Sequence, residues 1–221
     1  LIGDILSVAT TNGLDVNTSG TFALESFSDS FNSAITYPIS NLSLAASVSG
    51  LTIGKPTNSE NININASVSV AGPINIYGDN IWLNSSADLT STLEGSKVLL
   101  RGKGHIVIDS NSDLTTNNGD LILWSNYENI TSGTANNEVD LRGNNTISTS
   151  GGDIFIAGGE ADANKLPSGY AYRSDDDTIR SADLGQDVTV DSGGGNIIIK
   201  GQGGGVGVGF SGSGTSLNSD G

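Results

Sequence analysis

The side chains best suited to chemistry are acidic, and they gather in one polar stretch. Three consecutive aspartates form its centre: Asp175, Asp176 and Asp177. Four further carboxylates flank them: Glu160, Asp162, Asp183 and Asp187. Hard cations such as Ca²⁺ take several carboxylate and carbonyl oxygens at flexible spacing. The stretch matches neither an EF-hand nor the glycine-rich array of calcium-binding β-rolls, so a solvated acidic loop is the simpler interpretation. We predict no obligatory cofactor, with calcium as the ion that this loop could bind.

A small aromatic group in the same stretch suggests a second kind of chemistry. Tyr170 and Tyr172 could stack on a sugar ring, and Arg173 could hydrogen-bond to it. Trp124 and Tyr127 offer a second aromatic pair. Aromatic residues make up only 5% of the chain, so a local group of them is notable. The alternative is that these rings pack over the base of their own loop. We therefore predict Tyr170, Tyr172 and Arg173 as carbohydrate-binding residues.

The residue types that catalysis requires are scarce or unmarked. His105 is the sole histidine and cysteine is absent, so a transition-metal site is not expected, and no serine is marked as a triad nucleophile. Alternation along its strand predicts that His105 faces solvent. A polysaccharide lyase or hydrolase needs paired carboxylates, or acids beside a base in a groove. The candidates are Lys97, Arg101, Lys103, Arg142, Asp109, Asp120 and Asp140. Arg101 and Lys103 flank a predicted corner, where a surface turn accounts for them, so we predict that the chain is not an enzyme.

The framework that positions these side chains is a phrase that the chain repeats three times. The phrase spans residues 114–123, 147–156 and 188–199. Each copy is an apolar residue, a polar turn with glycine, an Asp or Asn, and a short apolar strand. A unit this short cannot bury its own apolar face, so it becomes stable only by stacking on copies of itself. The pattern predicts an all-β protein, a parallel β-helix in which each strand pairs with one a full coil away.

Short strands of the Ile-x-Ile type follow one another from Asn61 onward. Alternation sends two side chains of each strand inward. Regular β-branched residues of this kind also argue against disorder. We predict that the following residues face the core: Ile74, Ile76, Ile81, Leu83, Ile106, Ile108, Leu121, Leu123, Ile154, Ile156, Ile197 and Ile199.

Three segments are expected from the pattern. Residues 1–60 hold irregular strands and a covering loop, and residues 61–210 form the β-helix. An insertion over residues 160–187 projects from one corner, because that stretch is polar and interrupts the repeat. Residues 211–221 have the composition of a flexible Gly/Ser linker.

Composition limits the partners. The net charge is −15, with 24 acids against 9 bases, which repels phosphate backbones and excludes nucleic acid as an expected partner. No run approaches the ~18 apolar residues of a membrane span. The absence of cysteine fits a secreted bacterial protein. The chain does not begin with Met and shows no signal peptide, so we expect a portion of something longer.

Several of these phrases resemble repeat modules of giant cell-surface proteins of Bacteroidota, the filamentous-haemagglutinin-like adhesins. The resemblance covers roughly residues 40–210 and is carried by the segments 41–44, 50–55, 70–78 and 151–156. It implies a right-handed parallel β-helix, or β-solenoid, on the bacterial cell surface. It also implies adhesion or the spacing of a tip away from the cell, and some such proteins serve gliding motility. The family has no catalytic motif to carry over.

We therefore expect a structural or adhesive segment, a stalk or repeat module, of a large extracellular protein. Its expected partners are surface glycans, abiotic or host surfaces, and neighbouring repeats of the same polypeptide. The alternatives are a carbohydrate-binding β-helix module and, less favoured, a polysaccharide lyase or hydrolase.

Overall fold

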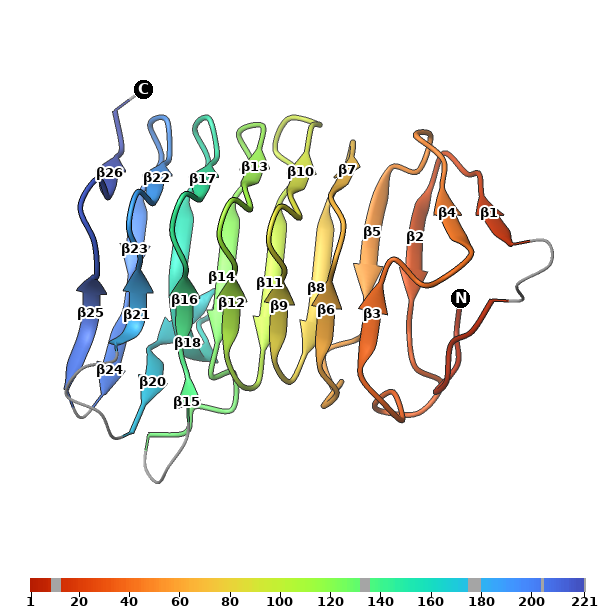
Figure 1. The fold of residues 1–221 in the computed structure, drawn as a ribbon, viewed down its shortest axis with the longest axis horizontal. Coiled ribbons are helices and arrows are strands. Elements are labelled where there is room, and N and C mark those ends of the chain that lie inside the picture. The colour runs from red at the N-terminus through yellow and green to blue at the C-terminus, as the bar shows by residue number, and fades with distance from the viewer. Residues whose placement is uncertain (9–12, 132–135, 175–179, 204, 221) are drawn as a thin grey trace.

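The computed structural model describes residues 1–8, 13–131, 136–174, 180–203 and 205–220 as an all-β protein. No helix occurs among these residues, and hence none that is long and apolar enough to cross a membrane. Most strands hold three to five residues, and nearly all of the pairs are parallel. The strands stack side by side along the longest axis of the molecule (Figure 1).

Three parallel sheets make up most of the fold. The eight-stranded sheet contains, in order, β2 (Thr21–Leu24), β5 (Gly50–Ile53), β8 (Ile74–Gly78), β11 (Val98–Gly102), β14 (Leu121–Ser125), β18 (Ile154–Ala161) and the antiparallel β19 (Pro167–Gly169), with β23 (Ile197–Ile199) also paired to β18. The seven-stranded sheet contains β3 (Ile35–Tyr37), β6 (Ile62–Ile64), β9 (Ile81–Leu83), β12 (Ile106–Ile108), β16 (Val139–Leu141), β21 (Arg180–Leu184) and β25 (Val206–Phe210).

The remaining strands form a third long sheet and two small ones. The six-stranded sheet contains β7 (Val68–Val70), β10 (Leu89–Ser91), β13 (Leu114–Thr116), β17 (Thr146–Ser148), β22 (Thr189–Asp191) and β26 (Ser216–Asn218). One small sheet pairs β1 (Leu14–Val16) with β4 (Leu42–Leu44). The other joins β15 (Asn136–Asn137), β20 (Ala171–Arg173) and β24 (Gly201–Gly203).

The chain passes through the three long sheets in turn and then repeats the circuit. Strands β8, β9 and β10 are followed by β11, β12 and β13, each of which pairs with its counterpart in the preceding circuit. Val98 pairs with Leu121, a step of 23 residues (98 to 121). This arrangement of all-β parallel sheets is compatible with a β-helix or solenoid.

The inward side chains are continuous columns of Ile, Leu and Val. Ten of the twelve residues predicted to face the core are fully buried, with 0% exposure, which confirms their placement: Ile74, Ile76, Ile81, Leu83, Ile106, Ile108, Leu121, Leu123, Ile154 and Ile156. The other two, Ile197 and Ile199, pack against this core but are only partly buried. They belong to the last strand of their column, and no further strand among the described residues covers them.

The repeated phrase forms one turn that recurs in three successive circuits. Its apolar strands lie in register, because Leu121 pairs with Ile154 and Ile154 pairs with Ile197. The hydroxyl of Thr149 donates to the Gly152 carbonyl oxygen at 2.5 Å. The equivalent hydroxyl–carbonyl bonds are Thr116 to Gly119 and Ser192 to Gly195. All three hydroxyl residues are buried, so each turn is fixed by a local bond that also satisfies a buried polar group.

The longer steps within the repeat come from side excursions, which are loops with short strands that leave the circuit through the three long sheets and later rejoin it. They do not come from extra circuits. The step of 33 residues (121 to 154) contains a loop with β15, and the step of 43 (154 to 197) contains β19 and β20. The long sheets continue through both. The predicted insertion 160–187 is therefore too long at its C-terminal end, because β21 is a regular strand paired with β16.

Two other predicted boundaries need correction. Strands β2 and β5 lie within residues 1–60 yet belong to the same sheet as the later strands, so no architectural change occurs at residue 61. Residues 211–221 were expected to be a linker, but β26 lies in this segment and pairs in parallel with β22. The composition misleads here because Gly and Ser also form the corners between strands.

The N-terminal residues fold over the first circuit. The backbone N–H of Glu25 donates to the Leu1 carbonyl oxygen, and Asn32 donates to that of Asp4, each at 2.9 Å. Leu6 and Val8 pack against the core, and Phe31 is buried with 2% exposure. The segment from β2 to β3 and the N-terminal residues thus cover part of this end of the stack.

Candidate functional site

Outward-facing side chains of the eight-stranded sheet form a second apolar cluster. It consists of Leu99, Ile122, Trp124 and Phe155, with Tyr77, Tyr127, Leu166 and Ile198 packed against it. Leu166 comes from the hairpin between β18 and β19, which covers part of this face. The indole N–H of Trp124 donates to the Gly159 carbonyl oxygen at 2.7 Å, which fixes the orientation of the ring.

Arg101 lies among three aromatic rings at the edge of this cluster. The register places it between Tyr77 on β8 and Trp124 on β14. Its guanidinium carbon is 4.0 Å from the ring centroid of Tyr127, 5.0 Å from that of Tyr77 and 5.6 Å from that of Trp124. Such distances allow cation–π attraction to all three rings.

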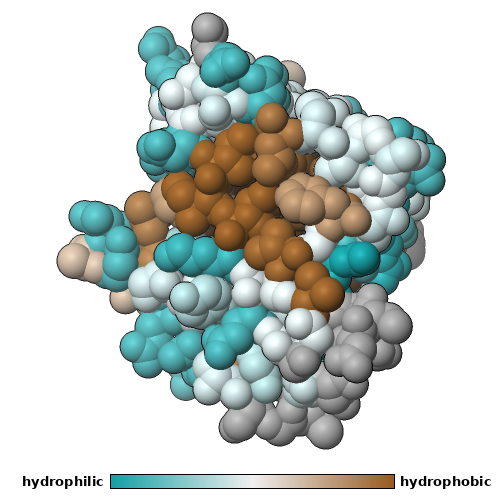
Figure 2. All heavy atoms as spheres, turned by 90° about the vertical axis from the view of Figure 1, so that its left-hand side faces the viewer, coloured by the Kyte–Doolittle hydropathy of each residue, from teal (hydrophilic) through white to brown (hydrophobic). Residues whose placement is uncertain are grey.

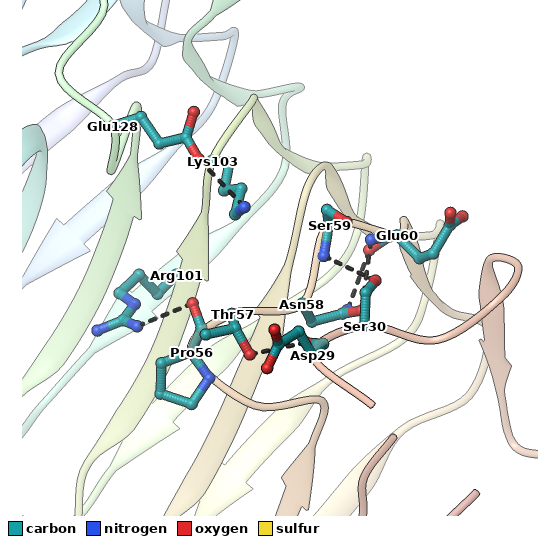
Figure 3. Close-up of polar contacts among 10 residues, drawn as sticks. All are labelled: Asp29, Ser30, Pro56, Thr57, Asn58, Ser59, Glu60, Arg101, Lys103 and Glu128. Atoms are coloured by element: carbon teal, nitrogen blue, oxygen red, sulfur yellow. Dashed lines mark hydrogen bonds and ion pairs between the residues drawn. The ribbon is translucent and has the colours of Figure 1, made fainter. Parts of the chain in front are cut away.

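The polar surroundings of Arg101 come from turns on either side (Figure 3). Its Nη2 donates to the Pro56 carbonyl oxygen at 3.3 Å. Lys103, two residues later, pairs instead with Glu128 at 3.1 Å. Burial lowers the pKa of Arg101, an effect that its tyrosine neighbours oppose, and burial raises the pKa of Tyr77. At neutral pH the guanidinium is still charged, because the ordinary pKa of an arginine lies far above neutral pH.

A second polar site lies on the outer face of the seven-stranded sheet. It is an open pocket of about 310 Å³ lined by three acids and three arginines: Glu138, Asp140, Asp183, Arg142, Arg173 and Arg180. Three ion pairs join them: Arg142 to Asp140 at 2.8 Å, Arg173 to Glu138 at 2.9 Å, and Arg180 to Asp183 at 3.6 Å. The cluster is balanced in charge, so it forms a network within the protein and presents no net charge to a ligand.

One carboxylate in this pocket, that of Asp183, is partly shielded from water. Burial raises the pKa of Asp183, and its neighbours Ser211 and Arg180 partly oppose that rise. The side chain of Arg180 reaches Asp183 across Gly209, where any Cβ would overlap it. Asp140 lies beside Asp183 in register on the neighbouring strand.

The predicted carbohydrate-binding residues are separated by the structure. Tyr170 is exposed (49%), whereas Tyr172 is buried (8%) because its strand lies between β15 and β24. Tyr170 and Tyr172 therefore do not form one exposed stacking surface. Arg173 lines the charged pocket, paired with Glu138.

The predicted calcium ligands Asp175, Asp176 and Asp177 lie outside the described residues. Within the part of the chain that the structure describes, no group of three or more acidic or histidine side chains could hold a metal ion.

His105 is less exposed than predicted. Its ring meets that of Trp82 edge-on, with centroids 4.6 Å apart, and the residue is partly buried. Burial lowers the pKa of His105, which nearby Glu138 opposes. The ring is therefore mostly neutral at pH 7 and packs on the outer face of the seven-stranded sheet.

The C-terminal end of the stack is open and apolar. A hollow of about 730 Å³ is lined there by Ile197, Ile199, Val208, Phe210 and Leu217 among others. Figure 2 views this end and shows a continuous hydrophobic patch surrounded by polar residues. Phe210 and Leu217 are exposed at 50% and 47%. Their partners in the preceding circuit, Leu184 and Val190, are both fully buried.

Comparisons with known proteins identify no relative of this chain. No family model matches the chain, and neither a curated protein nor a solved structure is significantly similar to it.

Sequence reasoning missed the group around Arg101, although one signal was available. Tyr77, Arg101 and Trp124 each lie three residues after the first residue of their strand, at Ile74, Val98 and Leu121. Alignment of these three strands by their apolar residues places the three side chains in one outward column.

Proposed function

We propose that this chain is a structural segment of a large secreted bacterial cell-surface protein, built as a right-handed parallel β-helix. In this role it serves as a stalk or repeat module with adhesive contacts along its sides. Columns of Ile, Leu and Val and the ladder hydrogen bonds between circuits give such a segment stiffness along the stacking axis. It performs no catalysis.

The observation that carries the proposal is the open C-terminal end. There, Phe210 and Leu217 are half exposed at positions that every preceding circuit buries. A contiguous apolar patch of this kind marks an interaction site. Further coils of the same polypeptide would cover it and extend the same three sheets, which fits neighbouring repeats as partners.

The test is to add one more coil. The added coil is a copy of residues 92–116, which contains the turn before β11 and the strands β11, β12 and β13. It is fused after Ser219, because the strand register makes Ser219 equivalent to Ser91, the residue that precedes this segment in the chain. If the open end accepts a coil, the melting temperature rises and binding of an apolar-surface dye falls. The matched control carries an Asp at the added copy's position equivalent to Leu100, a fully buried residue.

The architectural part of the proposal fails if the fusion and its Asp control melt alike. The cellular part is tested separately, by labelling intact cells of the source organism with an antibody against this segment. Signal only after the cells are broken open would contradict a surface location.

A further inference from the structure

Arg101 differs from every other arginine in the chain. The chain contains four arginines: Arg101, Arg142, Arg173 and Arg180. The last three each pair with a carboxylate at 3.6 Å or less. Among the described residues no carboxylate lies within ion-pair distance of Arg101, although acids outnumber bases by 24 to 9. A partly buried cation without a counter-ion is costly to hold, so its retention here calls for an explanation.

The guanidinium is held in place yet keeps donors free. Tyr127, Tyr77 and Trp124 surround it, and one N–H donates to the Pro56 carbonyl oxygen. A guanidinium has five N–H donors, so most of its hydrogen-bonding capacity is unused by the described residues. No nitrogen of Arg101 is buried without a hydrogen-bond partner. The nitrogens that make no bond within the described residues are therefore accessible to solvent. The group is thus pre-organised for an external acceptor.

We propose that Arg101, Tyr77 and Tyr127 form a binding site for a hexuronate residue of an acidic saccharide. The planar fork of Arg101 matches the two oxygens of a carboxylate. The rings of Tyr77 and Tyr127 hold the guanidinium between them, and both remain partly exposed, so their uncovered parts can contact the sugar beside the carboxylate. Lys103, two residues later in the chain, already pairs with Glu128, so these two side chains add no net charge beside the site.

This inference deepens the adhesive part of the proposed function and rests on it only for its biological setting. The protein carries a net charge of −15, so recognition of an acidic sugar has to be local. We therefore expect a dissociation constant in the millimolar range, on the order of 1 mM, for one short oligosaccharide.

The two tryptophans provide a built-in reporter. Trp124 lies beside Arg101, whereas Trp82 lies on the seven-stranded sheet against His105. The experiment titrates the full chain with tetragalacturonate and follows the two indole N–H signals by NMR. The Trp124 signal is expected to shift and the Trp82 signal to stay in place. Two further probes separate the contributions. The methyl-esterified tetrasaccharide has the sugar without the charge, and acetate has the charge without the sugar. Neither is expected to bind as tightly as tetragalacturonate.

Substitution then assigns the contact. Arg101→Gln should weaken binding about tenfold or more, because it removes both the charge and the fork. Arg101→Lys should weaken it less. Arg142→Gln is the matched control, since Arg142 is half exposed and lies on another sheet, and it should leave binding unchanged.

The proposal is overturned if tetragalacturonate leaves the Trp124 signal unmoved at about 10 mM, or if Arg101→Gln binds as well as the parent. It is equally overturned if the methyl ester binds as tightly as the acid, a comparison that requires no variant and so does not depend on how Arg101→Gln folds. The two experiments are independent. A negative saccharide titration would not alter the melting result expected for the added coil, and a failed added coil would not alter the result expected for the titration.

Discussion

The carboxylate of Asp153 accepts two hydrogen bonds from Asn196, from its backbone N–H at 2.7 Å and from its side-chain amide at 3.0 Å. Asp153 in turn donates its own N–H to the carboxylate of Asp120 at 3.1 Å. The Asp or Asn of the repeated phrase therefore ties each circuit to the next. This explains why the phrase keeps an acceptor side chain directly before each apolar strand.

We expect Asp153→Ala to lower the free energy of unfolding by about 1 kcal/mol, because two N–H groups of Asn196 lose their common acceptor at a partly solvated position. For a domain of this size that corresponds to a melting temperature about 2–4 °C lower. Thermal unfolding measures the change. Asp29→Ala is the control, since the Asp29 side chain is exposed and makes no hydrogen bond among the described residues. Equal effects of the two substitutions would contradict the role of Asp153.

Ile154→Asp should prevent folding, because Ile154 is fully buried and an aspartate there would be an unpaired charge in the core. Ile154→Val should fold and lose only about 0.5–1.5 kcal/mol. The control is Thr52→Asp at an outward position of β5, which should fold. Circular dichroism and thermal melting distinguish these outcomes, and an Ile154→Asp variant as stable as the parent would disprove the inward placement.

Phe210 and Leu184 occupy the same column in adjacent circuits but differ in exposure, at 50% and 0%. Leu184→Ala should cost about 2–5 kcal/mol, as is usual for a fully buried leucine. Phe210→Ala should cost less than about 1 kcal/mol, because half of its surface is already in water. Urea denaturation of both variants gives the comparison. Similar costs would mean that the C-terminal end is covered in solution.

Asp183 should make stability depend on pH. Its raised pKa means that the folded protein holds the proton more tightly than the unfolded chain does. The resulting stabilisation is fully present below the ordinary pKa of 3.8 and is lost as the pH rises through the higher folded value. Asp183→Asn should therefore be more stable than the parent at pH 7, with the advantage shrinking towards pH 3.

Melting curves at both pH values measure this difference, with Asp29→Asn as the exposed control. An advantage of Asp183→Asn that is independent of pH would show that ionisation of this carboxyl is not the cause. A variant less stable at pH 7 would show that the ion pair with Arg180 outweighs the desolvation of Asp183.

The core could be predicted from the sequence because two-residue alternation is a local signal. Ile74 and Ile76 were assigned inward from their spacing alone, and both are fully buried. Ile197 and Ile199 carry the same signal but are only partly buried, since their exposure depends on what lies beyond the last strand. Local patterns do not contain that information.

The polar sites could not be predicted in the same way, because they depend on register between circuits and on side excursions. Arg101 and Trp124 become neighbours only through the pairing of β11 with β14. Tyr172 is buried because β20 pairs with both β15 and β24, a small sheet that no periodicity in the sequence announces. Short strands within polar stretches such as Asn136–Asn137 lack the apolar alternation on which strand prediction relies.

The N-terminal residues fold over the first circuit, and this arrangement has a consequence for the order in which the circuits can fold. Each circuit needs only the one before it as a template, and the first is partly covered by residues that precede it in the chain. A nascent chain can therefore order itself progressively behind the point of synthesis, in the manner of a zipper. Loop closure at every step then spans only about one coil, so folding is not slowed by contacts between residues far apart in the sequence.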